Sequence, residues 1–270
     1  MSRKVVTKDI VVVKVGTAVL TENGRISASL IESVSSQISE LMPTRSFIIV
    51  SSGAILAGIS KIGLTLSPQE LDLTTKQMCA AVGQPWLMSL YSDAFAKRNI
   101  ITAQILLTEN DLGNKYEYQN FWRTLRALIV NNIVPIINEN DVVSTRELMP
   151  VNPYVPDYVR FGDNDRLSAI IATKVRAKSL IILTDVDGYI SNGSVMKEIA
   201  DIRNELKATK DKPNRFGRGG MKSKLEAAGI ASKHKTTTYI VNGRRPGIIR
   251  NVLSGEYTGT AVFPKGSSTR

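Results

Sequence analysis

The chain contains little cysteine, histidine or continuous apolar sequence, and each shortage excludes a class of protein. Cys79 and His234 are the single cysteine and the single histidine among 270 residues. One cysteine excludes an internal disulfide framework, and one histidine argues against a His-rich metal centre or a Cys/His site. No apolar run reaches the roughly 18 residues of a membrane span, and no signal-type segment opens the chain. We therefore expect a soluble, cytoplasmic protein without a membrane partner.

The length and the charge indicate one large domain and an anionic partner. A chain of 270 residues can bury a substantial core without disulfides, and we expect one domain over residues 1–270. The net charge is +11, which fits nucleic acid, membrane surfaces or anionic small substrates. The densest basic segment, 207–224, is a solvated loop, a nucleic-acid patch or a loop that faces phosphates. Nucleic acid is disfavoured because only Phe216 is available there for base stacking.

Short β-branched runs alternate with stretches of helical periodicity. Strands are expected at 11–15, 47–50, 100–107, 133–137, 180–183, 237–241 and 260–263. Helical stretches are expected at 26–41, 67–97 and 118–130, and also from about Asp165 and from near Met221. Ser67 and Pro68 are assigned to a helix start because serine caps and proline is tolerated in the first turn. The alternation predicts an α/β fold with a mostly parallel sheet, interrupted by a proline-containing loop at 142–161.

Small and charged residues follow several of the predicted strands. The segments concerned are Lys14–Thr17, Ser51–Ala54, Asn138–Asp141 and Thr184–Gly188, together with Gly162–Asp165 and Gly219–Lys224, which precede or open helices. In open α/β sheets, ligands bind beyond the carboxyl ends of the strands, so parallel strands would bring these segments to one rim. Lysines, backbone N–H groups and helix N-termini suit phosphoryl transfer, where catalysis is mainly positioning and electrostatic stabilisation.

Each of these segments also has an ordinary structural explanation. A lysine at a strand end is usually just exposed, Ser-Ser-Gly is commonly a turn, and Asp163 to Asp165 form a natural helix cap. The segment from Asp185 to Gly188 resembles a turn and lacks the spacing of a calcium loop. Neither a P-loop nor a G-x-G-x-x-G motif is present. The separate signals are weak, and only their order along the chain is specific.

That order resembles the amino acid kinase family. The motifs are V-K-V-G-T, S-S-G-A, A-A-V-G-Q, I-N-E-N-D, G-D-N-D, L-T-D-V-D-G and G-G-M-K-S-K-L, over about residues 9–263. The resemblance implies a three-layer αβα sandwich with two lobes, a substrate lobe at about 9–164 and a nucleotide lobe at about 165–265. This version of the motifs is similar to members that use ATP to phosphorylate the γ-carboxylate of L-glutamate, the first step of proline biosynthesis. Mg²⁺ is implied because it bridges phosphate oxygens.

The resemblance also implies roles for individual residues. Lys14 and Lys224 would flank the transferred phosphoryl group, and Asp165 would hold both lysines by charge-assisted hydrogen bonds. Glutamate would be bound by Ser52, Gly53, Asp141, Asn164 and Asp163, with hydroxyl and amide donors on its carboxylates and Asp141 on its α-ammonium. Asp163 would support either the substrate or the metal, and no residue is assigned as a metal ligand. ATP would lie against the two lysines, Gly16, Thr184, Asp185, Arg218, Gly219, Gly220, Met221, Lys222 and Ser223.

The sequence departs from the family pattern in two places. Many members carry a C-terminal domain of the PUA type, whereas this sequence stops after the kinase motifs, so we expect no PUA domain. The segment between Asp141 and Gly162 looks longer than in the bacterial form, which leaves feedback inhibition by proline open. We also expect a homo-oligomer. The rival hypotheses are a relative that acts on aspartate or N-acetylglutamate, and a non-catalytic amino-acid sensor or nucleic-acid-binding protein with the same fold.

Overall fold

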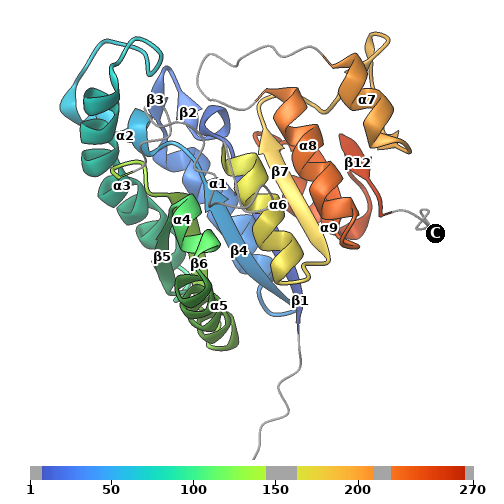
Figure 1. Cartoon of the computed structure of the whole chain (residues 1–270), viewed down its shortest axis with the longest axis horizontal. Helices are drawn as coiled ribbons and strands as arrows, with labels where there is room; N and C mark the ends of the chain where they lie inside the picture. The colour runs from blue at the N-terminus through green and yellow to red at the C-terminus, as the bar shows by residue number, and fades with distance from the viewer. Residues whose placement is uncertain (1–7, 144–162, 210–219, 265–270) are drawn as a thin grey trace, which may run out of the picture.

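A computed structural model describes residues 8–143, 163–209 and 220–264 of the chain. The described residues form three layers, with one large sheet between two layers of helices (Figure 1). This is the αβα sandwich with a continuous sheet that the motif order implies. The predicted loop at 142–161 lies outside the described residues except for Val142 and Val143.

Eight strands build the sheet in the order β10-β12-β11-β7-β1-β4-β6-β5. Neighbouring strands are parallel except at β11–β12, where the pairing is antiparallel. Their bounds are β1 Asp9–Val15, β4 Arg45–Ser51, β5 Thr102–Leu107, β6 Val134–Glu139, β7 Ser179–Thr184, β10 Glu198–Ile199, β11 Thr237–Asn242 and β12 Thr260–Val262. The mostly parallel sheet predicted from the alternation is thus confirmed.

One face of the sheet is covered by α4 (Glu109–Gly113), α5 (Lys115–Val130), α6 (Asn164–Lys174), α7 (Ile202–Ala208) and α8 (Met221–Ser232). Along β1, Val12 points into this layer, whereas Val11, Val13 and Val15 point to the other face. Side chains alternate along a strand, so Lys14 lies on the same face as Val12. The alternation therefore directs the single lysine of β1 toward the layer that contains α6 and α8.

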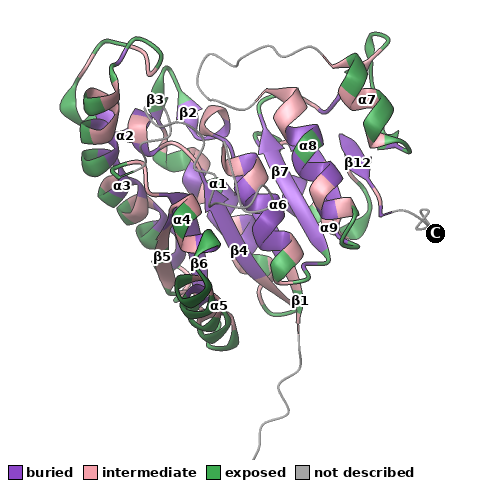
Figure 2. Cartoon of the chain, viewed as in Figure 1, coloured by how far each residue is buried: buried purple, intermediate pink, exposed green. Residues whose placement is uncertain are grey.

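The opposite face is covered by α1 (Ala28–Leu41), α2 (Ala54–Ile62), α3 (Leu73–Ala96) and α9 (Ile248–Ser254). Figure 2 shows the buried residues concentrated in the sheet and on the inner sides of the helices. Where α2 crosses α3, two glycines allow the backbones to touch. A Cβ on Gly58 would lie 1.8 Å from the Cys79 carbonyl oxygen, and one on Gly83 would lie 1.9 Å from that of Ala54. The start of α2 is therefore held tightly against the middle of α3.

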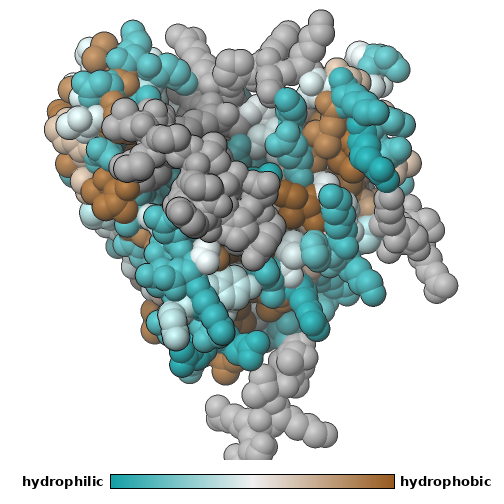
Figure 3. Space-filling model, viewed as in Figure 1, coloured by the Kyte–Doolittle hydropathy of each residue, from teal (hydrophilic) through white to brown (hydrophobic). Residues whose placement is uncertain are grey.

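Short elements complete the described residues. They are the 3-10 helix η1 (Thr17–Val19) and the small hairpins β2 (Thr21–Glu22) with β3 (Arg25–Ile26) and β8 (Ile190–Ser191) with β9 (Ser194–Val195). In the described part of the chain no helix is long and apolar enough to cross a membrane. On the face shown in Figure 3, apolar side chains form separate small areas among hydrophilic ones.

The predicted helix start at Ser67 is wrong. Residues 68–70 form an isolated turn in which the Glu70 carboxylate accepts hydrogen bonds from the Ser67 backbone N–H and hydroxyl. The helix begins at Leu73, and its N-cap is Asp72, whose carboxylate accepts from the Thr75 N–H at 2.7 Å. Serine and aspartate both cap well, so composition alone could not separate the turn from the helix that follows it.

Candidate active site

The candidate site lies at the edge of the sheet where parallel strands end. β1, β4, β6 and β7 run in the same direction, so the residues after each strand reach one rim. Gly16 follows β1, Ser52 and Gly53 follow β4, Asp141 follows β6, and Asp185 follows β7. The helices α6 and α8 begin close to this rim. Asp165, near the start of α6, bonds to Lys14 at the end of β1 and to Lys224 in the first turns of α8. The convergence predicted from the strand ends is thus present.

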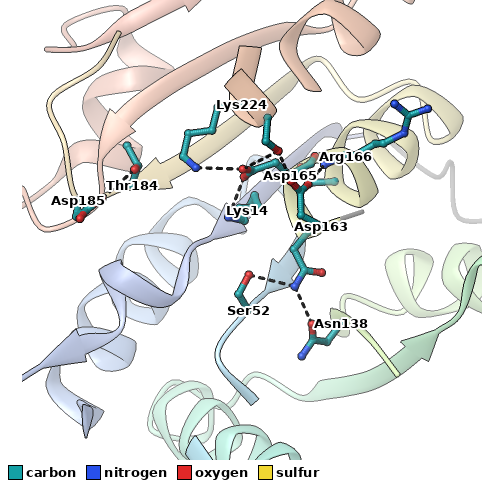
Figure 4. A network of polar contacts seen from close by, with 12 residues as sticks. Lys14, Ser52, Asn138, Asp163, Asp165, Arg166, Thr184, Asp185 and Lys224 are labelled. Carbon is teal, nitrogen blue, oxygen red and sulfur yellow. Dashed lines mark hydrogen bonds and ion pairs between the residues drawn. The ribbon is translucent and has the colours of Figure 1, made fainter. Parts of the chain in front are cut away.

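A carboxylate between two ammonium groups forms the centre of the site (Figure 4). The Asp165 Oδ1 lies 2.8 Å from the Lys14 Nζ, and the Asp165 Oδ2 lies 3.0 Å from the Lys224 Nζ. The three side chains are 1%, 7% and 8% exposed for Asp165, Lys14 and Lys224 respectively. Three elements distant in sequence, β1, α6 and α8, thus meet in one buried charged cluster with an excess of one positive charge.

Burial and charge act against each other on these groups. Burial alone would raise the pKa of Asp165, but the ammonium groups of Lys14 and Lys224 outweigh it and lower the pKa to about 2. Burial lowers the pKa of Lys14 below its ordinary value of 10.5, and repulsion from Lys224 adds to that effect while Asp165 opposes it. The carboxylate is therefore charged at all ordinary pH values, and Lys14 gives up its proton more readily than a lysine in water.

Gly16 leaves room beside the ammonium group of Lys14. A Cβ at this position would lie 3.4 Å from the Lys14 Nζ and 3.2 Å from the Leu183 carbonyl oxygen. A side chain here would press on the backbone at the end of β7 and would occupy the space next to the Lys14 ammonium group. The glycine lets the backbone pass close to the cationic group, as expected where a ligand must approach both.

Asp163 caps α6, and Asp165 does not. The Asp163 Oδ1 accepts from the Arg166 N–H at 2.9 Å, which is the N-cap contact of the helix. Its Oδ2 accepts a hydrogen bond from the Ser223 hydroxyl of α8, which also lies 3.3 Å from the Asp165 Oδ2. Capping therefore accounts for Asp163, whereas the buried Asp165 serves the two lysines.

A second cluster, formed by uncharged side chains, lies between β4, β6, α3 and α6. The Asn164 Nδ2 donates to the Ser52 Oγ at 3.1 Å and to the Asn138 Oδ1 at 3.0 Å. The Asn138 Nδ2 donates to the Gln84 Oε1 at 2.9 Å. We call these four residues, Ser52, Gln84, Asn138 and Asn164, the amide cluster. Figure 4 shows two of its members, Ser52 and Asn138, near the charged cluster, and Asn164 is the direct sequence neighbour of Asp165 in α6.

The remaining predicted nucleotide residues lie at the ends of two other elements. Thr184 ends β7 and is buried, and its Oγ1 donates to the Asp185 Oδ1 at 3.2 Å. Gly220 is the N-cap of α8, and Met221, Lys222 and Ser223 form the first turn of that helix. Arg218 and Gly219 lie outside the described residues, and so does most of the basic segment 207–224. Roles in binding for all of these residues stay predictions.

Two polar residues of the amide cluster had no role assigned from sequence. Asn138 and Gln84 both occur in the recognised motifs, and they are 1% and 5% exposed. The sequence did contain a signal for Asn138, which opens the polar segment Asn138–Asp141 after a predicted strand, and the structure continues that strand through Glu139. A polar side chain inside a buried strand must find partners. Gln84 gave no such signal, since a glutamine inside a helix is usually solvated.

The described residues offer Mg²⁺ a limited set of ligands. Groups of three or more acidic, cysteine or histidine residues able to hold a metal are absent from the described ranges. Asp165 is engaged by two lysines, which leaves Asp163 as the carboxylate beside them. This set fits Mg²⁺ only as an ion held mainly by phosphate oxygens and water, which is its usual mode in phosphoryl transfer.

Comparisons with known proteins identify the family of the chain. The model of the amino acid kinase family matches residues 9–242. A glutamate 5-kinase of Nitrosococcus oceani is 40% identical over 94% of this chain and 67% of its own length. A glutamate 5-kinase of Clostridium perfringens is 38% identical over 94% of this chain and 95% of its own length.

A solved structure supports the fold. Carbamate kinase from Giardia lamblia, bound to AMP-PNP, superimposes with a TM-score of 0.62 at 15% identity and covers 95% of this chain and 98% of its own. At that identity the likeness concerns the fold alone. The family model and the curated relatives carry the assignment further, since each spans most of the sequence. The chain belongs to the amino acid kinase family and groups within it with the glutamate 5-kinases.

Proposed function

We propose that this protein transfers the γ-phosphoryl group of ATP to the γ-carboxylate of L-glutamate, giving ADP and L-glutamate 5-phosphate. The observation that carries the proposal is the buried cluster of Lys14, Asp165 and Lys224. Glutamate as the acceptor is supported by the relatives named glutamate 5-kinase. The product is an activated carboxyl group, which suits the first step of a biosynthesis such as that of proline.

The charged cluster matches the needs of this transfer. The phosphoryl group spreads negative charge over its oxygens in the transition state, so fixed cations lower the barrier. Lys14 and Lys224 approach Asp165 from two different elements, and the carboxylate holds their ammonium groups close together despite their repulsion. The attacking γ-carboxylate is already ionised at neutral pH and needs no general base. The protein therefore supplies positioning and charge and no nucleophile of its own.

The two substrates are assigned to opposite parts of the rim. Residues 9–164 would form the glutamate lobe, with Ser52, Gly53, Asn164 and Asp141 around the substrate and Asp141 paired with its α-ammonium. Residues 165–265 would form the nucleotide lobe, with Thr184, Asp185 and the start of α8 near ATP. The N–H groups in the first turn of α8 favour phosphate. Asp163 would help to hold Mg²⁺, which neutralises β- and γ-phosphate charge when it is bound.

Further properties belong to the same proposal. We propose that the enzyme works in the cytoplasm as a homo-oligomer, and that proline is a candidate feedback inhibitor. Adding L-proline to the activity assay tests inhibition directly, and light scattering of the purified protein tests the oligomeric state. Inhibition requires a lower rate at fixed glutamate, with relief when glutamate is raised if the two compete.

The function is tested by measuring ADP release with a panel of acceptors. L-glutamate, L-aspartate and N-acetyl-L-glutamate are each supplied with ATP and Mg²⁺. We expect turnover with glutamate at least about a hundredfold above the other two, because Asp141 would offer an anionic partner to a free ammonium, which N-acetylglutamate lacks, and because aspartate is one methylene shorter than glutamate. A preference for N-acetylglutamate or aspartate would assign the chain to that reaction. Binding of glutamate without any ADP release would identify a sensor.

A further inference from the structure

One backbone N–H group fixes the orientation of the whole amide cluster. The Glu139 N–H points at the Asn138 side chain at 2.9 Å. A backbone N–H can only donate, so the atom of Asn138 that it contacts must be the oxygen, Oδ1. The other end of that side chain is therefore the Nδ2 group. The O and N atoms of an asparagine amide can often be exchanged without breaking a hydrogen bond. For Asn138 they cannot.

The orientation of Asn138 then determines that of Gln84. The Asn138 Nδ2 lies 2.9 Å from the Gln84 amide. Because an NH₂ group donates, the Gln84 atom at this contact is Oε1. The Gln84 Nε2 is left at the other end, buried and without a hydrogen-bond partner among the described residues.

The same step determines the orientation of Asn164. The Asn138 Oδ1 can only accept, so the Asn164 atom at 3.0 Å is Nδ2. The second hydrogen of that NH₂ group goes to the Ser52 Oγ at 3.1 Å. Both hydrogens of the Asn164 NH₂ group are thus donated to other residues of the protein. Its Oδ1 is buried and has no partner among the described residues, while the Ser52 oxygen accepts and keeps its own hydrogen for another acceptor.

This direction corrects one detail of the sequence-based assignment. Asn164 was expected to offer an amide donor to a substrate carboxylate. Its NH₂ group faces Ser52 and Asn138 instead, so the atom it can offer is an acceptor. A buried acceptor without a donor is costly unless a ligand supplies one. In an amino-acid substrate that donor is the α-ammonium group.

Gln84, like Asn138, has no role assigned from the motifs. It lies on α3 next to Gly83, whose close contact with Ala54 fixes this part of the helix against the start of α2. Its Oε1 is the acceptor for the Asn138 Nδ2. Without that acceptor the Nδ2 group would be a buried donor with no partner, and the Asn138 side chain would gain by rotating away from Asn164.

We propose that Gln84 is a positioning residue for the amino-acid substrate. By accepting from Asn138 it holds Asn138, and through it Asn164, in the one direction that presents the Asn164 Oδ1 to the α-ammonium. The proposal rests on the proposed function, because that function provides the amino acid. Gln84 acts through its neighbours, so its loss should weaken the affinity for glutamate and leave ATP binding unaffected.

The test compares three variants of the full chain. Gln84→Met keeps the length of the side chain and removes the acceptor. Gln84→Glu keeps an acceptor oxygen in either protonation state and removes the Nε2 group. Gln37→Met is the matched control, because Gln37 is 6% exposed and its Oε1 also accepts from a buried donor, the Ile249 N–H, at 3.0 Å. Gln37 lies on α1, on the opposite face of the sheet from the charged cluster.

We expect Gln84→Met to raise the KM for glutamate by about tenfold or more, with the KM for ATP within about twofold of the wild type. Gln84→Glu should keep the KM for glutamate within about threefold. Gln37→Met should lower the melting temperature without changing either KM. If Gln84→Met does not fold, Gln84→Leu replaces it, and Gln84→Glu remains an independent test.

Two results would overturn the proposal while leaving the proposed function intact. One is an unchanged KM for glutamate in Gln84→Met, and the other is an equal rise in Gln84→Met and Gln84→Glu, which would assign the effect to the Nε2 group. An equal rise in Gln37→Met would also reject it, since the effect would then be general destabilisation. A wild-type protein without turnover on glutamate would instead reject the proposed function, and the positioning role with it.

Discussion

The charged cluster and the amide cluster lie on the same rim but treat their polar atoms in opposite ways. In the charged cluster both Asp165 oxygens pair with ammonium groups, so the carboxylate is used up within the protein. In the amide cluster, hydrogen bonds run in one direction and leave the Asn164 Oδ1 and the Gln84 Nε2 without partners among the described residues. The charged cluster therefore has its carboxylate oxygens paired and carries one excess positive charge. The amide cluster has one acceptor and one donor without a partner among the described residues.

The difference indicates how the work is divided. A charge excess held rigidly stabilises a group whose charge grows during the reaction, which raises kcat. Neutral hydrogen-bonding atoms without a protein partner can bind the amino-acid end of glutamate. The charge of that end does not change during the reaction, so such contacts lower the KM for glutamate. Changes in the charged cluster should therefore act on kcat, and changes in the amide cluster should act on the KM for glutamate.

The largest expected effect comes from removing the central charge. Asp165→Asn would leave two buried ammonium groups facing each other, so we expect kcat to fall more than about a hundredfold. We also expect a loss of about 3–5 kcal/mol in unfolding free energy, as for other broken buried ion pairs. Asp72→Asn is the control, since Asp72 caps α3 at an exposed site and asparagine caps about equally well. Melting curves and kinetics on one preparation measure both. An active, stable Asp165→Asn protein would show that the triad is dispensable.

Removing either lysine should be nearly as severe for turnover. Lys14→Ala and Lys224→Ala should each lower kcat by at least about a hundredfold, because each removes one fixed stabiliser of transition-state charge. Lys178→Ala is the matched control, since Lys178 pairs with Asp9 at 3.0 Å but is 72% exposed. Steady-state kinetics with saturating substrates decide the matter. Near-normal kcat in both site variants would remove the charged cluster from the mechanism.

Asp141→Ala tests the glutamate-binding side of the rim. We expect the KM for glutamate to rise by about tenfold or more and the KM for ATP to change little, because an ammonium group loses its anionic partner. The assay varies each substrate in turn at a saturating level of the other. A rise confined to ATP would reverse the assignment of the two lobes.

The smallest expected effect is on the pH profile. Burial lowers the pKa of Lys14 below 10.5, so loss of its proton should reduce kcat/KM for ATP at a pH below 10.5. On the acid side the pKa of Asp165 is about 2, below its unfolded value. Its stabilising contribution is therefore complete above about pH 4 and is lost only as pH falls toward 2. A flat kcat/KM up to pH 10.5 in folded protein would contradict the assignment of Lys14.

The sheet could be predicted from local pattern, and the charged cluster from the order of motifs that resembles the amino acid kinase family. Runs of β-branched residues indicate buried strands such as Asp9–Val15. The motif order predicted that Lys14, Asp165 and Lys224 lie together at one rim, and the structure brings them together. The direction of the amide cluster could not be predicted in this way. It depends on the Glu139 N–H, which fixes the direction of the Asn138 side chain, and on the contacts of Asn138 with Gln84 of α3 and Asn164 of α6, which are remote in sequence.

The short elements also escaped prediction. α2 begins directly after Gly53, which adopts a φ of 105° that glycine accommodates readily, and the helix was not expected from sequence. Its nine residues are too few for a clear period, and its contact with α3 through Gly58 and Gly83 is tertiary. The turn at Ser67 was mistaken for a helix start for a related reason, since turn and cap use the same residue types.

The central claim is that the charged cluster drives phosphoryl transfer onto the glutamate carboxylate, and trapping the product tests it most directly. An acyl phosphate reacts with hydroxylamine to give a hydroxamate and free phosphate. We predict that wild-type protein with ATP, Mg²⁺, L-glutamate and hydroxylamine forms γ-glutamyl hydroxamate in a one-to-one ratio with ADP, and that Asp165→Asn forms neither at a comparable rate. ADP release without hydroxamate, or full hydroxamate formation by Asp165→Asn, would contradict the account.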